Sequence, residues 1–310
     1  MSVISMPEAR AGLSPRALAW YAVVVLALGW GLEAIAVFRV GLTSPAVRPW
    51  FMAGMWSPTV VAIGFLLFYP PARQGVRLGP GDLRYFPLGL FASAVLAFGT
   101  VALALGLGWG RPGWFEFHAS GVTVTGGPWK LGLGPQSWFR FVGNILVTGA
   151  WFAALNCVVA VGEEFAWRGF LQGHLVRRIR VPWALVVLGL FWSLWHLPML
   201  LAGYNYPDHP VLGALVLFPL ELVAASLFLG WLTLKSGSFW PAAFAHGATN
   251  GIEAGVLGNL RPSQGQLRLD LLHLGLTLGL GLLAWWLLRR SSRSQAARSV
   301  PFSAGRSGAT

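Results

Sequence analysis

The chain has 310 residues, of which 55% are hydrophobic and only 10% are charged, and its net charge is +12. Soluble domains carry about 25% charged residues, so this composition excludes an ordinary soluble protein and predicts a polytopic membrane protein in contact with lipid. The positive charge does not indicate a nucleic-acid partner, because the basic residues are spread over short loops and a tail, where membrane proteins carry their orientation signals.

Hydropathy divides the chain into a short N-terminal segment at 1–16, a helical bundle at 17–288 and a basic tail at 289–310 that its composition predicts to be disordered. An apolar run of about 20 residues is long enough to cross a bilayer as a helix. Such runs predict an all-α fold: about eight transmembrane helices in a single bundle, with a polar intramembrane cavity. In chain order the runs are 17–40, 51–69, 85–108, 138–176, 182–201, 211–234, 239–257 and 269–288.

Two segments depart from a simple series of spans. The stretch 110–136 is rich in Gly, Pro and aromatic residues, and it predicts a loop at the membrane surface with a hairpin in 121–127. The fourth run would be roughly 50 Å long as one helix, so it must tilt, break or begin along the membrane surface.

The distribution of Lys and Arg predicts the orientation of the chain. Eight spans place both termini on the same side, and if that side is the cytoplasm it holds twice as many basic residues as the other. Cytoplasmic loops carry the excess of Lys and Arg in membrane proteins. We therefore expect an integral membrane protein with cytoplasmic N- and C-termini, in the inner (cytoplasmic) membrane of a bacterium.

The fourth run carries two adjacent carboxylates and an arginine, Glu163, Glu164 and Arg168. A charge at the centre of a membrane helix costs about 2.5–3.5 kcal/mol on insertion scales, so these residues indicate a functional site. Glu164 and Arg168 are four residues apart and are predicted to form a structural ion pair on one helix face. Glu163 points about 100° away from Glu164 and remains free for chemistry.

Further polar residues lie in the fifth and seventh runs: His196 in one, His246 and Asn250 in the other. Counted from the basic turns and Lys235, these residues and Glu163 lie roughly 16–24 Å along their helices. Three separate helices thus bring polar groups to one depth, which predicts a convergent site.

The residue types suggest hydrolysis. Glu163 with His196 could activate a water molecule, and His246 and Asn250 could donate hydrogen bonds to a developing oxyanion. The alternative is that these groups only join helices by hydrogen bonds. Roles around these residues are assigned to Asn156, Trp192 and Glu253, with a helix interface as the alternative for Glu253. Glu33 and Glu221 are assigned to packing or cavity lining, and His273 to a structural or surface role.

The order and spacing of these motifs resemble the CPBP family, membrane proteases that include type II CAAX prenyl endopeptidases and bacteriocin-processing and immunity proteins. The motif core spans 160–255, and Trp192 stands where the family has Phe. The family pattern has Glu-Glu-x-x-x-Arg, Phe-x-x-x-His and His-x-x-x-Asn, which here are Glu163-Glu164-Phe-Ala-Trp-Arg168, Trp192-Ser-Leu-Trp-His196 and His246-Gly-Ala-Thr-Asn250.

The resemblance implies an intramembrane endopeptidase whose cavity opens to the cytosol. Its implied substrate is a peptide or protein, which in the CAAX-type members of the family carries a C-terminal lipid. The family has been described both as metalloproteases and as metal-free glutamic proteases. No cofactor is preferred here, because an asparagine is not a usual zinc ligand, but a zinc site of Glu163, His196 and His246 stays open. The alternative function is a non-catalytic immunity or binding protein that uses the same pocket.

Overall fold

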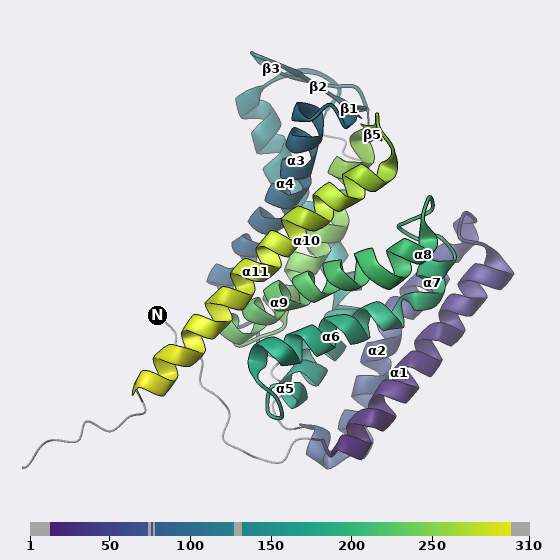
Figure 1. Cartoon of the computed structure of the whole chain (residues 1–310), viewed down its shortest axis with the longest axis vertical. Helices are drawn as coiled ribbons and strands as arrows, with labels where there is room; N and C mark the ends of the chain where they lie inside the picture. Colours follow the sequence, from purple (N-terminus) through teal and green to yellow (C-terminus); the bar gives the residue numbers. More distant parts are fainter. Residues whose placement is uncertain (1–12, 74–75, 77, 127–131, 299–310) are drawn as a thin grey trace, which may run out of the picture.

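A computed structural model describes residues 13–73, 76, 78–126 and 132–298, and it is a bundle of helices with short strands at one end (Figure 1). Among these described residues, six helices are long and apolar enough to cross a membrane. The predicted helical membrane bundle is therefore confirmed. The helices are α1 (Pro15–Ile35), α2 (Arg48–Phe68), α3 (Phe86–Gly106), α4 (Trp138–Glu164), α5 (Gln172–Leu175), α6 (Val181–Trp195), α7 (Leu197–Leu201), α8 (Pro210–Leu212), α9 (Phe218–Ser236), α10 (Trp240–Val256) and α11 (Gln266–Arg298).

The predicted count of eight spans is approximate. Each predicted run contains helix, but the runs at 182–201 and 239–257 form helices shorter than the six long ones. The first run ends in a π-helical segment (Ala36–Val40), and a second π-helical segment (Gly213–Leu217) joins α8 to α9.

The fourth run changes its helix type at the charged motif. The hydroxyl of Ser137 caps α4 by accepting from the backbone N–H of Arg140, so the helix begins at Trp138. After Glu164 the α-helix gives way to a π-helical segment, Phe165–Leu171, and then to α5. π-Helical turns inside α-helices are frequent at functional sites.

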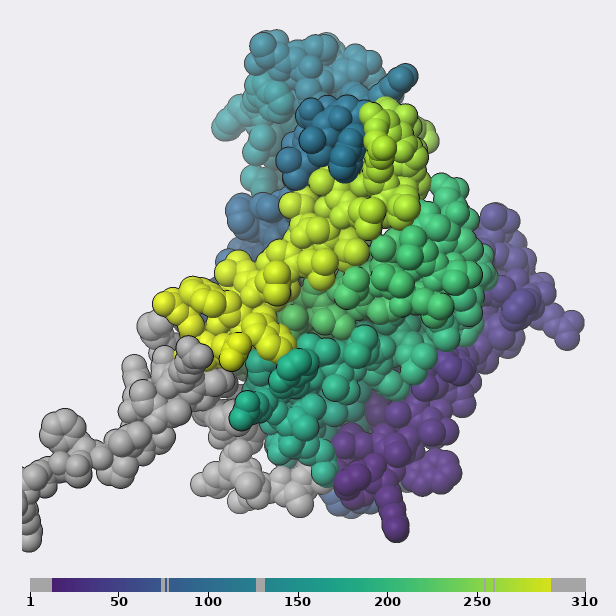
Figure 2. Space-filling model, in the orientation of Figure 1, coloured from purple at the N-terminus to yellow at the C-terminus, as the bar shows by residue number. Residues whose placement is uncertain are grey.

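Helices α9 and α10 form the most extensive helix–helix contacts of the bundle. Helix α10 packs against α3 and α4, and α9 packs against α6 and α11. Figure 2 shows α11, in yellow, lying over the green helices on one face of the molecule. The outer faces are apolar: Phe91, Trp151 and Leu282 are 68%, 65% and 68% exposed. Such exposure fits contact with lipid rather than with water.

Helices α10 and α4 approach so closely that Gly247 has no room for a side chain. An added Cβ would lie 2.5 Å from the backbone nitrogen of Cys157 and 2.7 Å from the carbonyl oxygen of Ala153. Gly251, one turn later, faces Phe152 in the same way, at 3.0 Å from its Cβ. Small residues at a helix interface allow this close packing in membranes.

Replacing Gly247 by alanine is expected to lower the stability by about 1–3 kcal/mol, because the added methyl group forces two backbones apart. Thermal unfolding in detergent measures the loss. Gly279→Ala on α11 is the matched control, since its Cβ would meet no atom within 4 Å. Equal unfolding temperatures for the two variants would contradict the packing argument.

The strands correct the prediction for the loop before α4. The hairpin joins β2 (Phe115–His118) to β3 (Gly121–Val124), and β4 (Gly134–Ser137) pairs with β3. Gly121 is thus a strand residue rather than the start of a turn. Its missing side chain lets β4 approach, because a Cβ there would lie 2.0 Å from the carbonyl oxygen of Gln136. The end of the predicted hairpin, residue 127, lies outside the described residues.

A separate sheet has only two strands. Strand β1 (Gly110–Pro112) pairs antiparallel with β5 (Leu260–Pro262).

The C-terminal helix runs further than predicted. Helix α11 continues to Arg298, ten residues into the tail for which composition predicts disorder. Its last turns contain Arg, Gln and Ala, which have high helix propensity.

Candidate active site

A cavity of about 740 Å³ lies inside the bundle, and all four candidate catalytic residues line it. Glu163 comes from α4, His196 from the α6–α7 junction, and His246 and Asn250 from α10. The common depth deduced from the sequence thus corresponds to one cavity. Glu163 and His246 are nearly inaccessible to solvent, at 2% and 8% exposure, although both line the cavity.

Glu163 is held by the indole of Trp192. The Nε1–H group of Trp192 donates to Glu163 Oε2 at 2.6 Å, which leaves Oε1 without this bond. The backbone carbonyl of Trp192 lies 3.0 Å from His196 Nδ1. A carbonyl can only accept, so Nδ1 carries the hydrogen and Nε2 of neutral His196 keeps its lone pair. Trp192 therefore orients both residues.

Glu164 has a second partner that the sequence did not reveal. Its Oε1 lies 2.7 Å from Arg168 Nη1, the contact that the i,i+4 spacing predicts, and both side chains are fully buried. The same oxygen lies 2.9 Å from His246 Nδ1. Glu164 therefore contacts both Arg168 and His246, so the ion pair is in direct contact with a residue of the candidate site.

The residues assigned to surrounding roles divide in the structure. Trp192 contacts Glu163 directly, and the guanidinium of Arg168 lies over its ring at 4.4 Å from the centroid. Asn156 turns to its own helix, where its amide donates to the carbonyl of Phe152. Glu253 lines the cavity, but its ion pair is with His273 on α11.

A zinc ion on Glu163, His196 and His246 would need their ligand atoms to converge. Within the described part of the chain, the three metal-capable side chains whose ligand atoms all lie within 4.8 Å are instead Glu221, Glu253 and His273. The ligand atoms of the first set do not converge to this distance, and a zinc site on them stays a prediction. Sequence reasoning missed the second set because its members lie on three helices and share no motif.

The cavity extends to one end of the bundle, where α2 begins, α10 ends and the chain passes from α7 to α8. Phe51, Asn205 and Gly258, all from or beside loops, line it there. At the opposite end, Leu13 accepts a hydrogen bond from Arg178, and Trp285 of α11 contacts Trp183 at the start of α6.

This placement bears on two expectations. The basic residues predict that the end of the bundle near Leu13 is cytoplasmic, so the end of the cavity lined by Asn205 would lie away from the cytosol. The resemblance instead implies a cavity that opens to the cytosol.

At this end of the cavity, Tyr206 donates its hydroxyl hydrogen to Glu221 Oε2 at 2.7 Å. Burial raises the pKa of Tyr206, and the nearby Glu221 charge raises it further. The hydroxyl therefore stays protonated at neutral pH and serves as a permanent donor to this carboxylate.

Comparison with known proteins agrees with the geometry. A family model described as type II CAAX prenyl endopeptidase Rce1-like matches residues 129–252, which contain all the motif residues of the site. The match supports a CPBP, or CAAX-type, family for this part of the chain. A curated relative, CAAX prenyl protease 2 of Methanococcus maripaludis, is 28% identical over 109 residues, which is 33% of this chain. The CAAX-type match spans 40% of the length of that relative.

Proposed function

We propose that this chain is a membrane-embedded endopeptidase that hydrolyses a peptide bond near the C-terminus of its substrate. The observation that carries the proposal is the convergence of Glu163, His196, His246 and Asn250 on one cavity. The match to CAAX-type endopeptidases over residues 129–252 supports the same class of reaction.

Glu163 and His196 would activate the attacking water. Because Trp192 occupies Glu163 Oε2 and His196 Nδ1, Glu163 Oε1 and His196 Nε2 are left as acceptors. A water bound by these acceptors gives up a proton as its oxygen attacks the carbonyl carbon of the peptide bond. The same proton then passes to the leaving nitrogen when the carbon–nitrogen bond breaks. No step of this mechanism uses a metal ion.

Asn250 and His246 would stabilise the oxyanion. The Asn250 amide can donate directly. Because His246 Nδ1 faces Glu164, donation from Nε2 requires the imidazolium form, and the Glu164 carboxylate at 2.9 Å favours that form. Arg168 on the same carboxylate holds Glu164 in place. Glu164 would therefore act on the reaction through His246.

The side of the membrane from which substrate enters follows from the orientation. We propose cytoplasmic termini, because the excess of Lys and Arg lies at that end of the bundle. The cavity then receives a peptide segment from outside the cytoplasm.

A cysteine label tests this orientation. Asn205→Cys, an exposed position that lines the cavity, is expected to react with a membrane-impermeant maleimide added to intact cells, whereas Arg73→Cys is expected to react only after lysis. Cys157→Ser in both variants removes the native thiol. The reverse labelling pattern would place the cavity on the cytosolic side.

The activity itself is tested with the full chain in liposomes. Peptides with and without a C-terminal prenyl group are offered, and cleavage is followed by mass spectrometry. Cleavage that is lost in Glu163→Gln supports the proposal. Binding of peptide without cleavage, equal in both proteins, would instead support a non-catalytic immunity or binding protein.

A further inference from the structure

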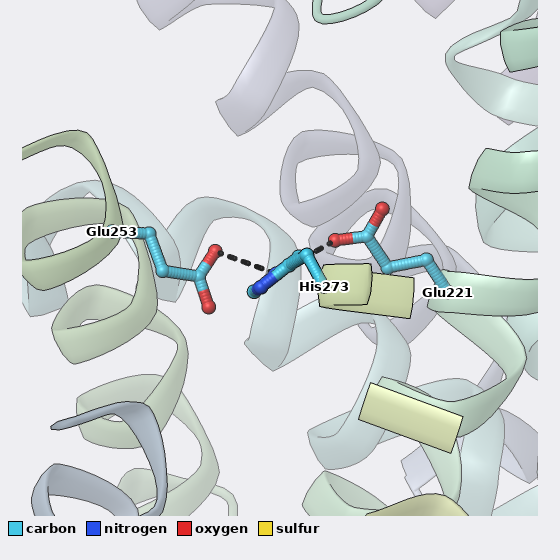
Figure 3. Close-up of side chains that lie close together, drawn as sticks. All are labelled: Glu221, Glu253 and His273. Atoms are coloured by element: carbon cyan, nitrogen blue, oxygen red, sulfur yellow. Dashed lines mark ion pairs between the residues drawn. The ribbon is translucent and has the colours of Figure 1, made fainter. Parts of the chain in front are cut away.

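Three metal-capable side chains meet in the cavity outside the candidate catalytic residues. Glu221 comes from α9, Glu253 from α10 and His273 from α11, and Figure 3 shows the imidazole lying between the two carboxylates. His273 Nε2 lies 3.7 Å from Glu221 Oε1 and 3.7 Å from Glu253 Oε2. One ligand atom of each residue lies within 4.8 Å of the others.

Thr100 decides which nitrogen of His273 carries a hydrogen. Its hydroxyl donates to the carbonyl oxygen of Leu96 at 2.7 Å, which uses its only hydrogen. Thr100 Oγ1 also lies 3.0 Å from His273 Nδ1, so it must accept from Nδ1–H. The Nε2 atom of neutral His273 therefore points its lone pair toward two carboxylate oxygens, an arrangement that a cation bound between them would stabilise.

The distances favour a metal ion over a proton. A charge-assisted hydrogen bond from an imidazolium nitrogen to a carboxylate is about 2.7–2.9 Å long. Both separations here are 3.7 Å, too long for such a bond on either side. Two ligands at about 2.1 Å from a tetrahedral zinc ion lie about 3.4 Å apart, close to the 3.7 Å between His273 Nε2 and each carboxylate oxygen. The carboxylate oxygens lie within 4.8 Å of one another and would move together around an ion.

The surroundings orient the three ligands and supply no competing cation. Thr100 holds the imidazole, and Tyr206 occupies Glu221 Oε2 at 2.7 Å while leaving Oε1 for an ion. Such outer hydrogen bonds fix metal ligands and raise their affinity. In the segments that the structure describes, no Lys or Arg side chain forms an ion pair with Glu221 or Glu253.

We propose that Glu221, Glu253 and His273 bind one divalent transition-metal ion, for which Zn²⁺ suits the imidazole and carboxylate ligands best. The site is separate from Glu163, His196 and His246, although an ion held there borders the same cavity. The proposal does not depend on peptidase activity, because metal binding can be measured without a substrate.

Zinc titration of the full chain tests the site. The protein is purified in detergent, stripped with a chelator and titrated calorimetrically with ZnCl₂. We expect one Zn²⁺ per chain in the wild type and loss of this binding in His273→Gln and in Glu253→Gln. Thr100→Val, which removes only the orienting hydroxyl, should weaken binding by about 10–100-fold. Co²⁺ in place of Zn²⁺ should give visible absorption bands that the two ligand variants lack.

Two control variants separate this site from other metal-capable groups. Glu163→Gln and His209→Gln should both bind Zn²⁺ as the wild type does. Thermal unfolding of the metal-free proteins shows whether each variant is folded. If His273→Gln or Glu253→Gln does not fold, the weaker Zn²⁺ binding expected of Thr100→Val tests the site instead. The proposal is overturned if the wild type binds no zinc, if His273→Gln and Glu253→Gln bind as well as the wild type, or if Glu163→Gln alone abolishes binding.

Discussion

Replacement of Glu163 by glutamine is expected to slow peptide hydrolysis by about 10²–10⁴-fold, the usual contribution of a general base. Glutamine has the same size, and its amide oxygen can still accept the 2.6 Å hydrogen bond from Trp192. It cannot take a proton from water. The rate constant for cleavage of a peptide by the full chain in liposomes measures the loss.

Glu33→Gln is the matched control for this experiment. Glu33 is also a buried carboxylate that lines the cavity, at 2% exposure, but it belongs to α1 and has no part in the proposed reaction. We expect it to retain hydrolysis, and both variants to unfold near the wild-type temperature. A Glu163→Gln protein that cleaves at the wild-type rate would refute the assignment of the base.

Glu164→Gln should act mainly on stability, lowering it by about 3–5 kcal/mol, because it leaves a buried charge without its counter-ion. The side chains of Glu164 and Arg168 are both fully buried. Arg168 Nε and Nη2 have no hydrogen-bond partner among the described residues, so the guanidinium depends on this carboxylate and on the ring of Trp192. Thermal unfolding in detergent measures the effect.

A double variant distinguishes the effect of an unpaired buried charge from the effect of altered side-chain packing. Glu164→Gln combined with Arg168→Met removes both charges, and substitution of a complete buried pair by residues of similar volume is often neutral. The double variant should therefore recover much of the stability that Glu164→Gln loses. If the single variant already matched the wild type in expression and unfolding temperature, the ion pair would not be holding the site together.

The helical bundle and the four cavity residues were predictable because their signals are local. A helix in a bilayer satisfies its own backbone hydrogen bonds, so an apolar run of sufficient length predicts a span without knowledge of its neighbours. The depth of Glu163, His196, His246 and Asn250 follows in the same way from the rise of a helix. The hairpin was misplaced because strand pairing depends on which segment lies opposite, and Gly121 pairs in a sheet that β4 completes.

The sequence by itself determined that the chain is a membrane bundle, that three of its helices carry polar groups at one depth, and that Glu164 and Arg168 can pair within one helix. Only the tertiary structure decided that Glu164 also contacts His246, that Trp192 holds Glu163, and that Glu221, Glu253 and His273 meet in the same cavity. The physical reason is that helix periodicity relates residues within one helix, whereas the rotation and packing of neighbouring helices decide which side chains meet between them.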